Sequence, residues 1–420
     1  MSKWWMVLAS LAVLWSTPAL AQDDPPAEEA DETRGDEAAV ADEVSVTEAE
    51  EERKDASRLY AMLAVDSWFL PEGGGRGAAV LAWQRDDFWK TGDLEIRFNT
   101  DTLQATVRNV RLNDRVKVGG RLKGQALFGG LLQDYYREGL VDRERIFWAS
   151  YINAAPHVEI QDAPNYIQLE LGVRRWFFSP MDPNTSPSLT LPPDLWAFEA
   201  RLRYTLWHAE HDPSFTDPHR TSWRFKGWAM GLELATDIRS DTSGWGALDE
   251  QAFDPVDRRN ITNSQPTWIR AWARGGRDTW SGGRVQGMAF LSIGQNEDDL
   301  TRVRVGGMNP YVVPVHGLPW TSHVLGNFAS LHGKVMQRIL SDSEIGLAVD
   351  VVGLSDEAAT RTTTTRSLEL EQALLGLGAV GDFRFGDWQV DARVGVAPGS
   401  TALASPLHVS AWLAVGKRLF

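Results

Sequence analysis

The chain has 420 residues, a formal net charge of −15, 19 tryptophans, 37 glycines and no cysteine. The lack of cysteine excludes disulfides, thiol catalysis, cysteine-ligated zinc and a lipid anchor on cysteine. The sequence contains no basic patch of the kind that would indicate binding to nucleic acid.

The N-terminus is typical of a secretory signal peptide. Lys3 provides a positive charge, an apolar run follows from Trp4 to Leu14, and the small-residue triplet at 19–21 suits cleavage after Ala21. The alternative is a single transmembrane anchor, but the run is short for the roughly 20 residues that a bilayer requires. We therefore expect residues 1–21 to be removed on export.

Residues 22–55 carry 15 acidic and 3 basic residues, so most of the net charge lies in this one segment. Such a composition cannot bury enough apolar surface to fold alone, and it predicts a disordered acidic tail in the periplasm. The simplest interpretation is a solvated spacer. A docking arm or a plug for a pore is the functional alternative.

From residue 56 to 420 the dominant pattern alternates apolar and polar residues, as in residues 195–206, LWAFEARLRYTL. Alternate side chains of a strand point to opposite faces of a sheet. An exported, tryptophan-rich chain without a spanning helix suggests an all-β fold, a transmembrane antiparallel β-barrel. The competing class is a secreted soluble β protein.

Sixteen strands are predicted in this domain, many of them long enough to cross a bilayer at a tilt. Their connections alternate between mostly tight turns and mostly long loops, which is the pattern of outer-membrane barrels. The predicted strands are 57–69, 76–86, 92–99, 102–112, 115–128, 146–159, 165–178, 195–208, 222–237, 266–276, 282–295, 326–339, 343–354, 367–381, 386–396 and 407–420. Residues 129–144 are predicted to be a long outer loop, and the 209–221 connection is long on the short-turn side.

In a membrane barrel the polar face of each strand lines the lumen. Charged residues on that face are expected to pair with one another or to set the ion preference of a pore. The predicted lumen-lining charges are Glu170, Arg174, Glu199, Arg201, Arg203, Asp391 and Arg393.

The segment 302–320, RVRVGGMNPYVVPVHGLPW, is an unusual outer connection. Its glycines and prolines interrupt any strand or helix, yet it is too apolar for an ordinary solvated loop. The segment has three glycines, Gly306, Gly307 and Gly317, and one histidine, His316, which directly precedes the third glycine.

These features resemble the outer-membrane assembly-factor superfamily, also called the bacterial surface antigen family, which includes barrel-assembly insertases and two-partner-secretion transporters. Gly306 and Gly307 match a glycine pair in its sixth outer loop, and residues 315–318 match the loop tip. Residues 347–353 match its strand-13 motif with Asp350 at the acidic position, and residues 414–417 resemble its final strand. The resemblance spans about residues 57–420.

The resemblance implies a sixteen-strand barrel whose loop 302–325 folds into the lumen, with the tip held by Asp350. His316 stands where the family has arginine, so we expect the pair to form only when the histidine is protonated, near or below a pH of about 6.5 unless its partner raises the pKa. Between residues 21 and 56 there is no room for the family's periplasmic polypeptide-transport domains. The terminal Phe420 suits a barrel-assembly signal.

Enzymatic chemistry is not expected. His208 and His211 lack the spacing of a metal site. The serine–histidine pairs Ser330 with His332 and Ser410 with His408 lie two residues apart in strands, and such pairs arise by chance.

We therefore expect a protein of the Gram-negative outer membrane that inserts or translocates polypeptides or lipids and uses no cofactor. Its expected partners are outer-membrane lipid, the machinery that assembles outer-membrane barrels, and a polypeptide or lipid client. The alternative function is a passive channel for small solutes, and a third class is a lipid-modifying barrel enzyme.

Overall fold

The computed structural model describes residues 57–419, apart from positions 72, 90, 126–130, 138–139, 188, 210–225, 242, 244, 248–264, 299, 309–312, 320–321, 341–342, 355–372, 400–402 and 404. The predicted signal peptide, the acidic tail, the long 209–221 connection beyond Ala209 and the terminal Phe420 lie outside the described residues.

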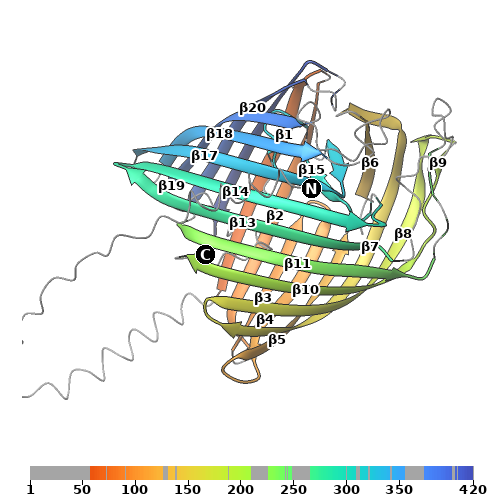
Figure 1. The fold of residues 1–420 in the computed structure, drawn as a ribbon, viewed down its shortest axis with the longest axis horizontal. Helices are drawn as coiled ribbons and strands as arrows, with labels where there is room; N and C mark the ends of the chain where they lie inside the picture. Colours follow the sequence, from red (N-terminus) through yellow and green to blue (C-terminus); the bar gives the residue numbers. More distant parts are fainter. Residues whose placement is uncertain are drawn as a thin grey trace, which may run out of the picture. The chain divides into compact units, whose positions relative to one another are not determined.

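The described strands form an antiparallel sheet that closes on itself (Figure 1). Each strand pairs with its neighbour along the chain, and β1 returns to β21 through a register that runs from Tyr60 opposite Arg418 to Leu70 opposite Val409. The strands around the barrel are β1 (Ser57–Leu70), β2 (Gly74–Phe88), β3 (Gly92–Asn99), β4 (Thr102–Arg111), β5 (Val116–Gln125), β7 (Leu140–Asp162), β8 (Asn165–Thr185), β10 (Trp196–Ala209), β11 (Gly227–Arg239), β13 (Thr267–Trp280), β14 (Gly283–Gln295), β17 (Phe328–Leu340), β18 (Ser343–Leu354), β19 (Leu374–Phe385), β20 (Trp388–Pro398) and β21 (Leu407–Arg418).

The sixteen predicted strands are confirmed, and the structure corrects one loop. Residues 129–144 contain β6 (Leu131–Arg137) and the start of β7, which pair as a hairpin from Arg137 opposite Leu140. β6 lies beside β7 beyond the end of β5, so it lengthens the wall without adding a position around the barrel. The two tyrosines of this segment favour a strand despite the glycines and charges around them.

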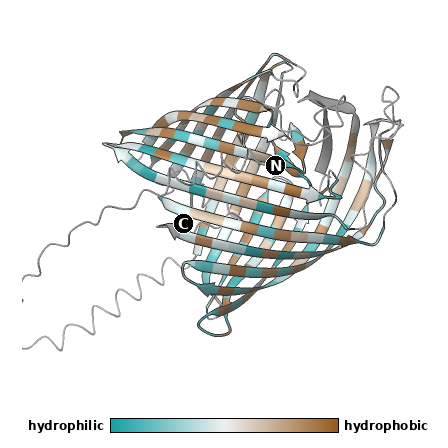
Figure 2. Cartoon of the chain, viewed as in Figure 1, coloured by the Kyte–Doolittle hydropathy of each residue, from teal (hydrophilic) through white to brown (hydrophobic). Residues whose placement is uncertain are grey.

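Along the strands the apolar side chains are exposed and the polar side chains are buried, which is the reverse of a soluble protein. On β8 the side chains of Leu169, Leu171 and Val173 are 44–45% exposed, whereas Glu170 between them is only 4% exposed. Apolar and polar bands alternate in the same way along the other strands (Figure 2). An apolar exterior around a polar interior is the arrangement of a barrel that faces lipid.

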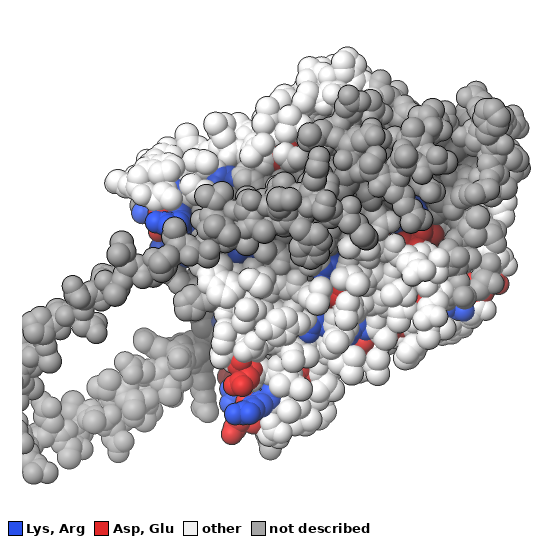
Figure 3. Space-filling view, viewed as in Figure 1, with Lys and Arg blue, Asp and Glu red and all other residues white. Residues whose placement is uncertain are grey.

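The outer wall supports this orientation. Most of the described surface in Figure 3 carries no charged side chain. Exposed tryptophans stand near strand ends, among them Trp196, Trp280 and Trp388, where a bilayer meets water. With its closed antiparallel sheet, the barrel is an outer-membrane protein of a Gram-negative bacterium. None of the described residues forms a helix long and apolar enough to cross a bilayer.

A charged substitution on the lipid-facing side should destabilise the barrel according to depth. Leu202 lies midway along β10, whereas Ile238 is the next-to-last residue of β11, on the same face as the exposed Met230 and Leu232. We expect Leu202→Arg to reduce the free energy of unfolding by about 2–4 kcal/mol and Ile238→Arg by about 0–1 kcal/mol. Denaturant titration in lipid vesicles measures both, and equal costs would contradict the assigned membrane orientation.

Candidate functional site: a loop packed inside the barrel

The connection between β14 and β17 holds a small hairpin. β15 (Val303–Val305) pairs antiparallel with β16 (His323–Leu325). The expectation that turn-forming residues exclude any strand from residues 302–320 is therefore wrong at the start of the segment, where β15 lies, whereas β16 lies beyond its end. The glycines and prolines lie between the two short strands, so the ends are free to pair.

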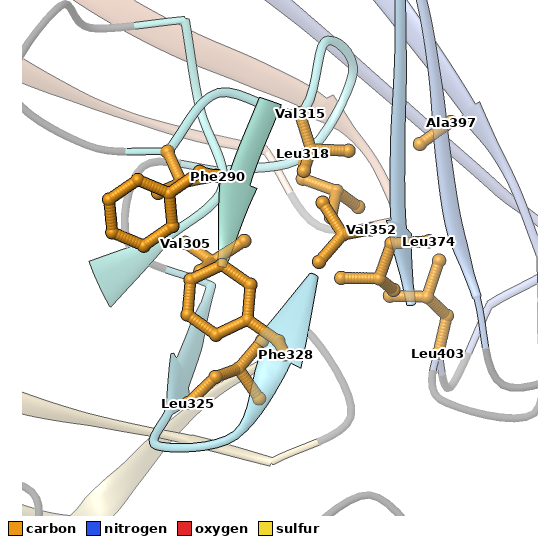
Figure 4. Packing of buried hydrophobic residues seen from close by; sticks show 11 residues of the cluster. Phe290, Val305, Val315, Leu318, Leu325, Phe328, Val352, Leu374, Ala397 and Leu403 are labelled. Carbon is orange, nitrogen blue, oxygen red and sulfur yellow. The ribbon is translucent and has the colours of Figure 1, made fainter. Parts of the chain in front are cut away.

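An apolar core joins this loop to the inner wall of the barrel (Figure 4). It explains why the segment is too apolar for a solvated loop, because its side chains are withdrawn from water. The loop contributes Val305, Val313, Val315, Leu318 and Leu325. The wall and the neighbouring connection contribute Phe290, Phe328, Val352, Leu374, Ala397 and Leu403.

The three glycines of the loop have left-handed backbone conformations, with φ of 108° at Gly306, 82° at Gly307 and 97° at Gly317. Residues with a Cβ rarely adopt such angles. The glycine pair brings two segments together, since the Gly306 amide donates to the Val313 carbonyl and the Val315 amide donates to the Gly307 carbonyl, both at 3.0 Å.

His316 lies against Asp350 of β18. Its ring Nδ1 is 2.5 Å from Asp350 Oδ2, and its main-chain amide donates to the same oxygen at 2.7 Å. The other oxygen of Asp350 is 2.9 Å from Nδ1 of His332, which stands directly opposite on β17. One buried carboxylate thus holds a loop and two neighbouring strands.

Glycines on the next two strands make room for the histidine. A methyl group added at Gly378 would collide with the His316 ring, and one at Gly376 would lie 2.6 Å from its main-chain nitrogen. On β20, a methyl group at Gly395 would lie 2.7 Å from the His316 Cβ. We call Gly376, Gly378 and Gly395 the glycine seat. The seat was not predicted from the sequence, although GLG at 376–378 puts both glycines on one strand face.

The loop also contacts the inner wall near the place where β1 pairs with β21. Arg393 of β20 donates to the carbonyl of Met308 at 2.7 Å, and Ser410 of β21 donates to the carbonyl of Leu318 at 3.3 Å. Met308 packs with Met62, Val80 and Trp412. The loop therefore touches the inner wall at two separate places.

The base of the connection is fixed by permanent charges. Arg239 of β11 makes two hydrogen bonds to Asp298, at 2.6 and 3.0 Å, and both side chains are fully buried. Arg270 of β13 donates to Glu297 at 3.0 Å and to the carbonyl of Thr301 at 2.7 Å. Arginine stays charged at all accessible pH values, so the base differs in kind from the histidine-bearing tip.

The predicted lumen-lining charges fall into two groups. Asp391 and Arg393 lie on β20 beside the loop and pair at 3.1 Å. The others lie on β8 and β10 and form a network: Arg121 with Glu170 at 2.9 Å, Arg203 with Glu233 at 2.8 Å, and Glu199 with both Arg174 and Arg201. This second group lines the wall away from the loop tip.

Burial lowers the pKa of His316, and this effect outweighs the hydrogen bond and the charge of Asp350, which raise it. The ring is therefore neutral near pH 7, and Nδ1–H donates to the carboxylate. With the pKa shifted in this direction, the contact with Asp350 does not require a protonated histidine. The cause of the shift is that the ring sits in a dry seat, where an added positive charge loses its hydration.

The serine–histidine pairs of β17 and β21 face the interior and not the lipid. Ser330 Oγ is 2.9 Å from Nε2 of His332, whose Nδ1 faces Asp350, so the three residues have the order of a hydrolase triad. Ser330 is only 3% exposed, however, and Asp350 is already occupied by His316. In this arrangement the Ser330 hydroxyl is withdrawn from solvent. The side chains of His208 and His211 lie outside the described part of the chain.

No protein-family model and no curated protein matches the sequence. Solved structures do match the fold. CdiB from Acinetobacter baumannii aligns with 8% identity and a TM-score of 0.52 over 87% of this chain and 60% of its own. BamA from Haemophilus ducreyi lacking POTRA domains 1–3 aligns with 9% identity and a TM-score of 0.53 over 87% and 70%.

CdiB from Escherichia coli aligns with 13% identity and a TM-score of 0.52 over 85% of this chain and 62% of its own. The chain therefore spans less than two thirds of both CdiB structures. At these identities the likeness concerns the barrel fold alone.

A methyl group in the glycine seat should displace the loop tip. We expect Gly378→Ala to increase the frequency of current openings in a planar bilayer severalfold, because the His316 ring must move. Gly77→Ala is the matched control, since a methyl group there would meet nothing within 4 Å. Equal behaviour of the two variants would contradict the seat.

Docking of the tip should weaken in acid. Because the docked His316 has a pKa below the ordinary value of about 6.5, the docked loop favours the neutral ring. This contribution is complete above the ordinary pKa and is lost as the pH falls through the lowered one. Current openings should therefore be more frequent at pH 5 than at pH 7.5.

His316→Asn is the control for this pH effect, because an asparagine amide can donate to Asp350 without titrating. Other charged or titratable groups near His316 are His332, Lys334 and Arg393. An unchanged pH profile in His316→Asn would assign the effect to one of them and contradict the role of His316.

Proposed function

We propose that this barrel inserts or translocates a polypeptide or lipid client at the outer membrane, and that loop 302–325 is its internal gate. The observation that carries the proposal is the dry core between the loop and the inner wall, joined to the His316–Asp350 contact. A passive channel needs at most a narrowing of its lumen, whereas a loop that packs against the wall through its own apolar core can close it. A transporter needs such a barrier, because an open lumen would make the membrane leak.

The fold comparisons support the same class. CdiB and BamA share this barrel architecture, and the resemblance in the loop and in β18 points to insertases and two-partner-secretion transporters. His316 and Asp350 occupy the positions of the family's loop arginine and strand-13 aspartate. We propose that they act as the lock, with Gly306, Gly307 and Gly317 shaping the loop that His316 anchors.

A small-solute channel is the second candidate, and one observation favours it. The charge network on β8 and β10, with Glu170, Glu199 and Arg203, lines a polar wall away from the loop tip. A water-filled passage along that wall would select ions by charge. The loop would then narrow the passage without closing it.

Bilayer recordings separate the two functions. The loop variant should replace residues 303–325 with a short Gly-Ser linker and keep Asp298, so that the base contact to Arg239 remains. We expect small, fluctuating currents from the full chain and a large, steady conductance from the variant. A large, steady conductance from the unmodified chain would favour the channel and contradict the gate.

Client transfer is measured separately. A urea-unfolded eight-stranded outer-membrane barrel is added to lipid vesicles that contain this protein, and folding is followed by heat-modifiable gel mobility. A parallel assay follows the transbilayer exchange of labelled phospholipid. Acceleration in either assay supports the proposal and identifies the client class, whereas rates equal to those of empty vesicles in both would contradict it.

A further inference from the structure

One arginine interrupts the lipid-facing side of β8. The exposed residues Leu171, Val173 and Phe177 share that face, and Arg175 occupies the same alternation between Val173 and Phe177. Its neighbour Arg174 points the other way, into the lumen, where it pairs with Glu199. Arg175 therefore needs a different explanation from the lumenal charges.

The height of Arg175 on the wall follows from the strand. β8 begins at Asn165, immediately after the short connection at 163–164. Ten residues at about 3.3 Å each, tilted by about 40°, rise roughly 25 Å, which is the height of the apolar band of such barrels. Arg175 thus stands at the rim nearest the long loops, which is the outer leaflet.

Two aromatic rings flank its guanidinium. The Arg175 Cζ lies 5.3 Å from the ring centroid of Trp196 and 5.6 Å from that of Phe177. Trp196 is directly opposite Arg175 in the β8–β10 register. Stacking of this kind fixes the guanidinium plane and leaves N–H donors at its edge.

Within the described residues these N–H donors have no anionic partner. The side-chain contacts of the Arg175 guanidinium there are with the rings of Phe177 and Trp196. A guanidinium edge matches two phosphate oxygens in a bidentate geometry. Directly below it, Leu171 and Val173 present an apolar surface to acyl chains. The ligand that fits both features has a phosphate on its head group and hydrocarbon beneath it.

We propose that Arg175, Phe177 and Trp196 form a binding site for the phosphate of a lipid in the outer leaflet, and lipid A is the phosphate-bearing lipid used to probe it. The rings hold the guanidinium, the guanidinium binds the phosphate, and the apolar wall below accepts the acyl chains. This site lies on the outside of the barrel, so it does not depend on the gate or on the proposed client.

The opposite rim provides a matched control. Lys417 of β21 lies over the Trp388 ring, with its Nζ 5.0 Å from the centroid, next to the short connection at 386–387. It is a cation on an exposed tryptophan, as Arg175 is, but it faces the inner leaflet. A lipid that binds at the outer-leaflet rim should not depend on it.

The test is native mass spectrometry of the mature chain in detergent micelles with added lipid A. We expect Arg175→Gln to lower the bound lipid A at least fivefold, Arg175→Lys to lower it less because it retains charge but not the fork, and Lys417→Gln to leave it unchanged. Heat-modifiable gel mobility verifies that each variant is folded.

Dephosphorylated lipid A should bind the unmodified chain as weakly as lipid A binds Arg175→Gln. Equal binding by Arg175→Gln and the unmodified chain would overturn the proposal, as would equal binding of dephosphorylated lipid A. An equal loss in Lys417→Gln would replace a specific site with general charge attraction. Displacement of lipid A by millimolar inorganic phosphate would show an anion site that does not recognise lipid.

Discussion

The structure depends on a closed backbone ladder in a solvent that offers no hydrogen bonds. In hydrocarbon every main-chain amide and carbonyl must find a partner within the protein, and the pairing of β1 with β21 removes the last free edge. Closure then determines where side chains go. Residues such as Leu171 face lipid, residues such as Glu170 face inward, and anything polar that the function needs must be in the lumen or at a rim.

Within that lumen, Asp350 organises the contact between wall and loop. Its two oxygens accept from the His316 amide, from the His316 ring and from His332. Because the main-chain amide contributes one of these bonds, the contact does not require a charged ring. An arginine at this position would bring a permanent charge and a longer side chain, whereas histidine fits a seat lined by glycine and can respond to pH.

The strands were predictable because the lipid imposes alternation over long runs, and β3 and β18 end at the residues expected from sequence. β6 and the start of β7 were missed, since Leu131–Arg137 lacks the regular alternation of the membrane-crossing strands. Both members of the His316–Asp350 contact were predicted from sequence, through residue types and resemblance. Three features could not be predicted: the glycine seat, the neutral His316 ring and the exposed N–H donors of Arg175. Each depends on which side chains lie opposite one another on neighbouring strands, and this is set by the register of the strands.

A disulfide between residues 316 and 350 tests the central claim most directly. The chain has no cysteine, so His316→Cys with Asp350→Cys introduces the only pair, and oxidation in intact outer membranes can be followed by mass spectrometry. The account predicts efficient cross-linking at 316/350 and none when the second cysteine replaces Leu347, which faces lipid on the same strand. No cross-link at 316/350, or equal yields from both pairs, would show that the loop does not occupy the lumen.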